Sequence, residues 1–183
     1  YAVMINAKEF YNKESSIFKK FIERKKSKIS LVRIAINFYE YKNARKIINN
    51  LNNLGYEVGL NLMQAHDKTE KELKDLIFDV RSWNQKINFL YFADSLGCMD
   101  AKYINFITSK MVNYWKGDIG IHAHNNKSMA LSNTLVSLSS GSKICDSTIL
   151  GMGRGAGNAQ TEFLLQELKG PLNYKQLKLV NDL

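Results

Sequence analysis

Two of the three histidines in this 183-residue chain stand two positions apart, in Gly120-Ile121-His122-Ala123-His124. The residues before them form a short apolar run with the length of a β-strand, and side chains two apart on a strand point to the same face. His122 and His124 can therefore share one divalent metal ion. The alternative is a pair of unrelated core or surface histidines, and the position at a strand end favours the metal site.

A glycine-rich segment, Gly151-Met152-Gly153-Arg154-Gly155-Ala156-Gly157, leads into Asn158. Glycine adopts positive φ readily and lets the backbone approach a ligand closely. We expect a helix containing Glu162 to follow, and the free N–H groups at its start would suit a phosphate or carboxylate. The alternative is a merely tight strand-to-helix turn. The segment lacks Gly-Lys-Ser/Thr, which excludes a Walker loop, and a dinucleotide-binding fingerprint matches poorly.

Three other polar side chains follow apolar runs and are candidate substrate contacts. In Tyr91-Phe92-Ala93-Asp94-Ser95-Leu96-Gly97, Asp94 and Ser95 place a carboxylate and a hydroxyl at a strand end. They could bind substrate or cap the next helix, and the residues alone leave both open. His66 also stands just beyond a strand. A lone loop histidine is more often structural or solvated, and we keep His66 as a candidate substrate contact.

A short apolar run followed by a longer amphipathic segment recurs about every 30 residues. The short runs have the length of buried strands; they are Ala2–Ile5, Leu31–Ile36, Val58–Met63, Phe89–Ala93, Ile119–Ala123 and Ile144–Ile149. Strand alternating with helix predicts an α/β fold with a parallel sheet. No linker divides the chain, so we expect one domain over residues 1–183. Spacing leaves two architectures open, a doubly wound open sheet and an incomplete (β/α)8 barrel, since a complete barrel needs about 250 residues.

Local helix signals agree with this alternation. Thr69 and Glu72 have the spacing of a capping box. Asp100 can cap the helix that follows it. Gly55 and Gly141 stand where a glycine would end the helix before it.

The formal net charge of +9 could indicate a nucleic-acid partner, but the positions of the charges argue against one. Much of the excess lies between Lys19 and Lys28, which we interpret as the solvated end of a helix whose buried side carries Phe10 and Phe18. No apolar run approaches the roughly 18 residues of a membrane span, so no membrane partner is expected. Cys98 and Cys145 are far apart and lack metal-ligand spacing. They indicate no disulfide framework, which favours a reducing cytoplasm.

Three motifs occur in a fixed order: Asp94-Ser95-x-Gly97, His122-x-His124-Asn125 and Gly151-x-Gly153-Arg154-x-x-Gly157-Asn158. Together with Ala130-x-x-Asn133-Thr134 and Asp146-Ser147-Thr148, they resemble the DRE-TIM metallolyases. That family includes 3-hydroxy-3-methylglutaryl-CoA (HMG-CoA) lyase, 2-isopropylmalate synthase, homocitrate synthase and 4-hydroxy-2-oxovalerate aldolase. The resemblance is strong over residues 89–168. It extends more weakly to the start of the chain, where residues 3–5 and 31–35 look like the third and fourth barrel strands of the aldolase branch.

The resemblance implies a (β/α)8 TIM barrel that holds one divalent metal ion, Mn, Mg, Zn or Co. It makes His122, His124 and Asn158 metal ligands. The family's remaining ligand is an Asp on the first strand, in an Asp-x-Arg segment whose Arg stabilises the enolate oxygen, and residues 1–183 contain no such segment. Because the chain starts with Tyr1 rather than Met, we expect it to hold about six of the eight β/α units, with the first two and this segment preceding it.

The implied reaction is that of an aldolase or lyase, which cleaves or forms a C–C bond next to a 2-oxo acid through a metal-stabilised enolate. Two alternatives stay open, a Claisen-type synthase that condenses an acyl-CoA with a 2-oxo acid, and a non-catalytic barrel that binds a metabolite. The segment with Arg154 resembles the corresponding segment of the synthases, whereas Asp94-Ser95 resembles that of the oxovalerate aldolases. Asn125-Asn126 departs from the Asn-Asp that many members have after the second histidine. The expected partner is a small 2-oxo acid, and the general base stays unassigned. A homo-oligomer would cover the open edges of an incomplete barrel.

Overall fold

The computed structural model describes residues 1–169 and contains one sheet of six parallel strands. The strands are β1 (Ala2–Asn6), β2 (Leu31–Asn37), β3 (Glu57–Met63), β4 (Phe89–Asp94), β5 (Asp118–Ala123) and β6 (Ile144–Cys145). Neighbours in the sheet are also neighbours in the sequence, from β1 to β6. This is the strand order of a (β/α) barrel, whereas a doubly wound sheet reverses its order at a switch point. The prediction of a partial barrel is therefore confirmed.

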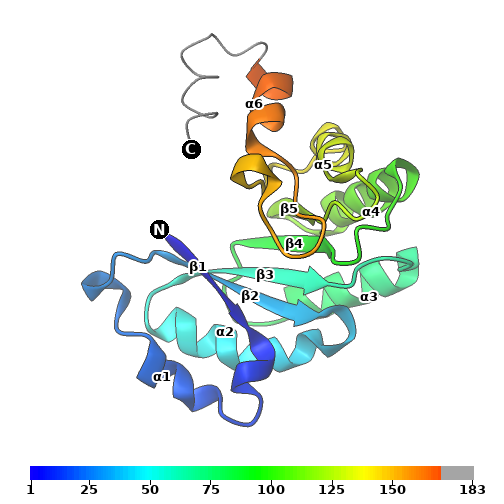
Figure 1. The fold of residues 1–183 in the computed structure, drawn as a ribbon. Coiled ribbons are helices and arrows are strands. Elements are labelled where there is room, and N and C mark those ends of the chain that lie inside the picture. The colour runs from blue at the N-terminus through cyan, green and yellow to red at the C-terminus, as the bar shows by residue number, and fades with distance from the viewer. Residues whose placement is uncertain (170–183) are drawn as a thin grey trace.

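Each strand from β2 to β6 is followed by a helix of nine residues or more. These helices are α2 (Ala44–Asn53), α3 (Glu70–Arg81), α4 (Ala101–Tyr114), α5 (Ala130–Ser139) and α6 (Thr161–Lys169). The connection from β1 to β2 instead holds the short α1 (Ile17–Lys20) and 3₁₀ turns at Ala7–Phe10, Glu14–Ser16 and Arg24–Lys26. Further 3₁₀ turns span Phe38–Asn43 and Ile149–Gly151. In Figure 1, α2 and α3 lie below β2 and β3, and α4 and α5 lie above β4 and β5.

The two faces of the sheet differ in chemistry because side chains alternate along each strand. One face carries apolar residues such as Ile34 and Leu60, which are fully buried in the core that the strands form with the helices. The intervening residues point to the barrel interior, and they include Arg33, Asn61 and His122. The helix-covered face therefore stabilises the fold, and the interior face carries the polar groups.

Two glycines allow aromatic rings to lie directly against neighbouring strands in the interior. A Cβ atom on Gly59 would stand 2.1 Å from the ring of Phe89, and one on Gly120 would stand 2.5 Å from the ring of Tyr91. Neither distance is possible for real atoms, so any side chain at these positions would displace the ring. Gly120, two positions before His122 on β5, thereby leaves space for the Tyr91 ring of the neighbouring strand β4.

The capping signals are confirmed. The Thr69 side chain accepts from the Glu72 backbone N–H while the Glu72 side chain accepts from the Thr69 N–H, which is a complete capping box at the start of α3. The Asp100 side chain accepts from the Tyr103 N–H at the start of α4. Gly55 and Gly141 have φ of 87° and 108°, in the left-handed region that ends α2 and α5.

The last strand is shorter than predicted. We expected Ile144–Ile149, and only Ile144–Cys145 pairs with β5 as a strand. Beyond Cys145 the chain leaves the ladder: Thr148 forms an isolated bridge with Gln160, and Leu150 has a positive φ of 54° inside a 3₁₀ turn. Apolar composition alone does not reveal this change of partner.

The predicted helix in the basic region is present but short. It spans Ile17–Lys20 and ends in the exposed Lys19 and Lys20, because Phe21 is extended. Phe10 is fully buried as expected, but Phe18 is half exposed. Among residues 1–169, every helix falls short of the length and apolarity needed to span a bilayer.

Replacing Thr69 by Ala should lower the free energy of unfolding by about 1 kcal/mol, because α3 loses the side-chain acceptor that caps its first turn. Thr69→Ser keeps the hydroxyl and serves as the matched control. Urea unfolding of both variants measures the effect, and equal stabilities for Thr69→Ala and Thr69→Ser would contradict the role assigned to the cap.

Candidate functional site

The three predicted metal ligands are neighbours at the carboxyl ends of the strands. His122 and His124 lie at the end of β5 and just beyond it, with ring centroids 5.0 Å apart and ring planes at 78°. Asn158 lies beside them because it forms an isolated antiparallel bridge with His124. Two segments 34 positions apart in sequence thus place the backbone of Asn158 next to that of His124.

The amide oxygen of Asn158 is a buried acceptor without a partner. Asn158 is 8% exposed, and its Oδ1 has no hydrogen-bond partner among residues 1–169. Its Nδ2 donates to the Met152 carbonyl at 3.2 Å, which turns the oxygen away from that carbonyl. The glycine-rich segment packs closely over the amide, since a Cβ on Gly153 would stand 2.5 Å from Nδ2. A buried acceptor of this kind costs free energy unless a cation, a water molecule or a ligand satisfies it.

One nitrogen of His122 is held by a carboxylate. Its Nδ1 lies 2.8 Å from Oδ2 of Asp146, and this contact leaves Nε2 free. Metal-binding histidines commonly direct their second nitrogen to a carboxylate, which fixes the ring orientation and raises the basicity of the ligating nitrogen. The Asp146 contact therefore suits a histidine that binds a metal ion.

Asp146 also pairs with Arg33, which reaches it from β2. Both terminal guanidinium nitrogens donate to the two carboxylate oxygens at 2.8 Å, and the guanidinium carbon lies 3.9 Å from the centre of the Tyr91 ring. Burial raises the pKa of Asp146, but hydrogen bonds from His122 and Arg33 outweigh it and leave that pKa below its ordinary value. Asp146 is therefore ionised at neutral pH.

The environment favours the neutral form of His124. Burial lowers the pKa of its imidazole, and the neighbouring His122 ring and the Arg154 guanidinium lower it further, against a smaller opposing effect from Asp94. Neutral imidazole is the form that binds metal ions. The donor set, two imidazoles and one free amide oxygen, thus fits a borderline divalent cation.

Asp94 and Ser95, the predicted substrate contacts at the end of β4, have different surroundings from each other. The Asp94 carboxylate is fully buried and accepts from the N–H groups of Cys98 and Met99, at 3.0 and 3.1 Å. It shapes the turn before α4, and its carbonyl accepts from the His124 N–H at 3.4 Å. Ser95 lines the same cavity as the two histidines, and its Oγ accepts from the Gln64 N–H at 2.9 Å.

His66 is not brought together with the other candidates. It lines a separate hollow of about 390 Å³ with Cys98, Asp100 and Tyr103. The backbone has positive φ at Gln64 and Asp67, both 56°, and this turn carries His66 away from the barrel mouth. A substrate contact from His66 stays a prediction that the described contacts do not support.

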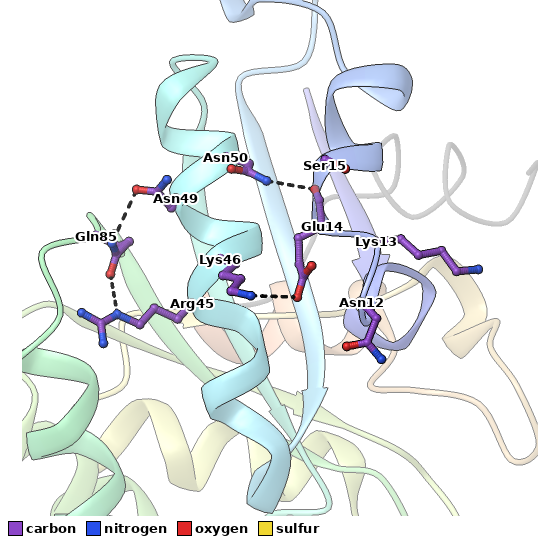
Figure 2. Close-up of a pocket in the computed structure, with 9 residues that line it drawn as sticks. All are labelled: Asn12, Lys13, Glu14, Ser15, Arg45, Lys46, Asn49, Asn50 and Gln85. Atoms are coloured by element: carbon purple, nitrogen blue, oxygen red, sulfur yellow. Dashed lines mark hydrogen bonds and ion pairs between the residues drawn. The ribbon is translucent and has the colours of Figure 1, made fainter.

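The cavity in front of the histidines has a volume of about 330 Å³ and mixes apolar, amide and charged groups. Its wall includes Ala35, Asn37, Asn61, Met63, Gln64, Ala93, Ser95 and, at its mouth, Lys8 and Arg154. A larger hollow of about 640 Å³ lies on the outer surface, between residues 12–15 and α2 (Figure 2). Its polar side chains pair with one another, for example Arg45 with Gln85 at 3.2 Å and Lys46 with Glu14 at 4.0 Å.

Sequence reasoning assigned no role to Asp146, Arg33 or Asn61. A signal for Arg33 was present, because a charged residue in the apolar run Leu31–Ile36 must find a partner. That its partner would be Asp146, 113 positions later, depends on the tertiary fold. Within the described residues, no cluster of three His, Cys, Asp or Glu side chains could hold a metal ion, so a third ligand from these residues would be of another kind, such as the Asn158 amide.

A family model described as HMGL-like matches residues 27–181 of the sequence. The chain belongs to the HMGL-like family. The matched residues include both the histidine pair and the glycine-rich segment, so the resemblance drawn from the three motifs is confirmed. This family includes metal-dependent aldolases and lyases.

Curated relatives of this HMGL-like chain are named 4-hydroxy-2-oxovalerate aldolase. The protein from Bacillus thuringiensis (strain Al Hakam) is 32% identical over 138 residues, which cover 75% of this chain and 40% of that protein. The protein from Pelotomaculum thermopropionicum is 28% identical over 141 residues, covering 77% and 41% respectively. The chain thus spans about two fifths of the length of these relatives.

Solved structures share the fold of the HMGL-like chain. The N-terminal domain of a protein described as an aldolase from Bacteroides vulgatus has a TM-score of 0.83 at 24% identity, covering 98% of this chain and 60% of that one. The carboxyl transferase domain of Rhizobium etli pyruvate carboxylase, with pyruvate and biocytin, has a TM-score of 0.81 at 12% identity, covering 99% and 33%. At these identities the likeness establishes the barrel architecture alone.

Replacing Asp146 by Asn should lower the free energy of unfolding by about 3 kcal/mol near pH 7, because Arg33 keeps a largely buried charge without its carboxylate. The folded-state pKa of Asp146 is lowered. Its stabilising effect is therefore complete above the ordinary value of about 3.9 and is lost as the pH falls through the folded value.

Urea unfolding at about pH 7 and about pH 3 measures this difference between the wild-type protein and Asp146→Asn, which should shrink at the lower pH. Asp118→Asn is the matched control, because Asp118 pairs with Lys143 at the surface at 3.4 Å. That control should change stability by no more than about 0.5 kcal/mol. Equal effects of the two substitutions would contradict the buried network.

Proposed function

We propose that His122, His124 and Asn158 hold a divalent metal ion and that the protein is an aldolase, which cleaves or forms the C–C bond next to a 2-oxo acid. The close pair of imidazoles carries the proposal, together with the unpartnered, buried oxygen of Asn158, whose backbone pairs with that of His124. Family membership and the names of the relatives support the aldolase reaction.

His122, His124 and Asn158 supply three of the proposed ligands, and further ligands are needed to complete the set. Two nitrogens and one oxygen suit Mn, Mg, Zn or Co, each of which takes four or more ligands. The resemblance to the metallolyases implies an Asp on an earlier strand as the next ligand, and water can occupy further positions. When bound, the metal ion acts as a Lewis acid that polarises the substrate carbonyl.

The chain's own groups prepare this site. Asp146 orients the His122 ring through Nδ1, and burial together with Arg154 keeps His124 in its neutral form. Arg154 lines the cavity mouth, where a guanidinium suits the carboxylate of a 2-oxo acid. The Ser95 hydroxyl lines the same cavity and can donate a hydrogen bond to substrate, while Asp94 positions the turn that presents Ser95.

The remaining expectations are proposals of the same kind. We propose one domain over residues 1–183, a small-molecule partner rather than nucleic acid or membrane, and a cytoplasmic location. A homo-oligomer is proposed because β1 and β6 are the two edges of the described sheet.

The reaction is tested by pyruvate release from 4-hydroxy-2-oxovalerate with the full-length protein, stripped of metal with a chelator and reloaded with Mn, Mg, Zn or Co. Activity should need the metal and fall at least about 100-fold in His122→Ala and in His124→Ala, because each substitution removes a ligand. Asp118→Asn is the control and should stay within about 3-fold, because Asp118 pairs with Lys143 at the surface and lies outside the cavity.

Full activity after chelation, or in His122→Ala, would contradict the proposal. Release of CoA from an acyl-CoA and a 2-oxo acid, without pyruvate release, would replace the aldolase by a Claisen-type synthase. Metal binding without either reaction would indicate a metabolite-binding barrel.

A further inference from the structure

A buried carboxylate on α6 contacts the turn at which the glycine-rich segment begins. Glu162 lies in the first turn of α6 and is 7% exposed. Its Oε2 accepts a hydrogen bond from the Leu150 N–H at 3.1 Å. Burying a carboxylate costs free energy, and a hydrogen bond that it accepts offsets part of that cost. The position of the Glu162 side chain is thus tied to the position of the Leu150 backbone.

Leu150 has a backbone conformation that its side chain disfavours. Its φ of 54° lies in the left-handed region, which costs a residue other than glycine about 1 kcal/mol or more. The Leu150 side chain is 54% exposed, so its packing contributes little to holding the residue there. The turn is instead held by hydrogen bonds, from the Leu150 N–H to Glu162 and from the Gly151 N–H to the Thr148 carbonyl at 3.0 Å.

The two residues after Leu150 hold the Asn158 amide. The Gly151 carbonyl accepts from the Asn158 N–H at 2.9 Å, and the Met152 carbonyl accepts from Nδ2 of its side chain at 3.2 Å. A Cβ atom on Gly157 would stand 2.2 Å from the Gly151 oxygen, so the chain just before Asn158 also lies against this turn. A shift of the turn at Leu150 would therefore move both carbonyls that orient Asn158.

The ends of the loop are joined independently of Glu162. The Thr148 N–H donates to the Ala159 carbonyl at 3.0 Å, and the Thr161 N–H donates to the Thr148 carbonyl at 3.0 Å. Neither hydrogen bond involves the Glu162 side chain. Removing that carboxylate should thus loosen the turn at Leu150 while the ends of the loop stay together.

We infer that Glu162 is a positioning residue for the metal site. Its hydrogen bond to Leu150 fixes the turn whose carbonyls orient the Asn158 amide, and it thereby raises the affinity of the site for a divalent ion. The inference rests on the proposed function, in which Asn158 is a ligand. Groups that orient the ligands of a metal ion typically contribute about 10- to 100-fold to its affinity.

The affinity of the metal-free, full-length protein for cobalt ions tests the inference without turnover. Isothermal titration should give at least about 10-fold weaker binding for Glu162→Ala than for the wild-type protein. Glu162→Gln keeps a side-chain oxygen that can accept from the Leu150 N–H and should stay within about 3-fold. Glu167→Ala is the matched control, because Glu167 is exposed on the same helix, and it should leave the affinity unchanged.

A double-mutant cycle separates positioning of Asn158 from a general loss of structure. Because Glu162 is inferred to act through Asn158, Glu162→Ala should weaken cobalt binding no further in a protein that already carries Asn158→Ala. Equal weakening in both backgrounds overturns the inference, as does an unchanged affinity in Glu162→Ala. If Glu162→Ala does not fold, Glu162→Asp keeps the carboxylate but draws it back by about 1.5 Å, and the same outcomes apply.

The inference and the proposed function fail separately. Cobalt binding that needs His122 and His124 but does not depend on Glu162 would retain the metal site and reject the inference alone. A dependence on Glu162 and Asn158 without pyruvate release would retain the inference and reject the aldolase reaction. Failure of the wild-type protein to bind cobalt would reject the metal site and, with it, the inference.

Discussion

The ion pair between Arg33 and Asp146 is the interaction on which the rest of the interior depends. Arg33 belongs to β2 and Asp146 follows β6, so in a flat sheet their strands would lie about 19 Å apart. Their hydrogen bonds of 2.8 Å require the sheet to curl into part of a barrel. The same carboxylate also contacts His122, so one side chain joins the curvature of the sheet to the orientation of a ring that we propose as a metal ligand.

Local signals predicted what local physics determines. The capping box at Thr69 and the strand runs depend on neighbours in sequence, and both are found where expected apart from the shortened β6. The pairing of Arg33 with Asp146 and the cavity position of Asn61 depend on curvature and on which face each strand presents. His66 lines a different hollow, and its loop turns at Gln64 and Asp67, which have positive φ although neither is glycine.

An unpartnered acceptor lies close to the histidine pair in the fold. Asn158 buries an amide oxygen without a partner in the described chain, and its backbone pairs with that of His124. Such an oxygen suits a cation. Membership of the HMGL-like family and the aldolase names of the relatives agree with a site that holds a metal ion and a small oxygen-rich acid.

X-ray absorption spectroscopy of the cobalt-loaded, full-length protein tests the metal site most directly. The site described here predicts about two imidazole nitrogens near 2.1 Å together with oxygen ligands, and loss of the imidazole scattering in the His122→Ala/His124→Ala double variant. A first shell without imidazole, or a spectrum that the double substitution leaves unchanged, would show that the histidine pair does not bind the metal ion.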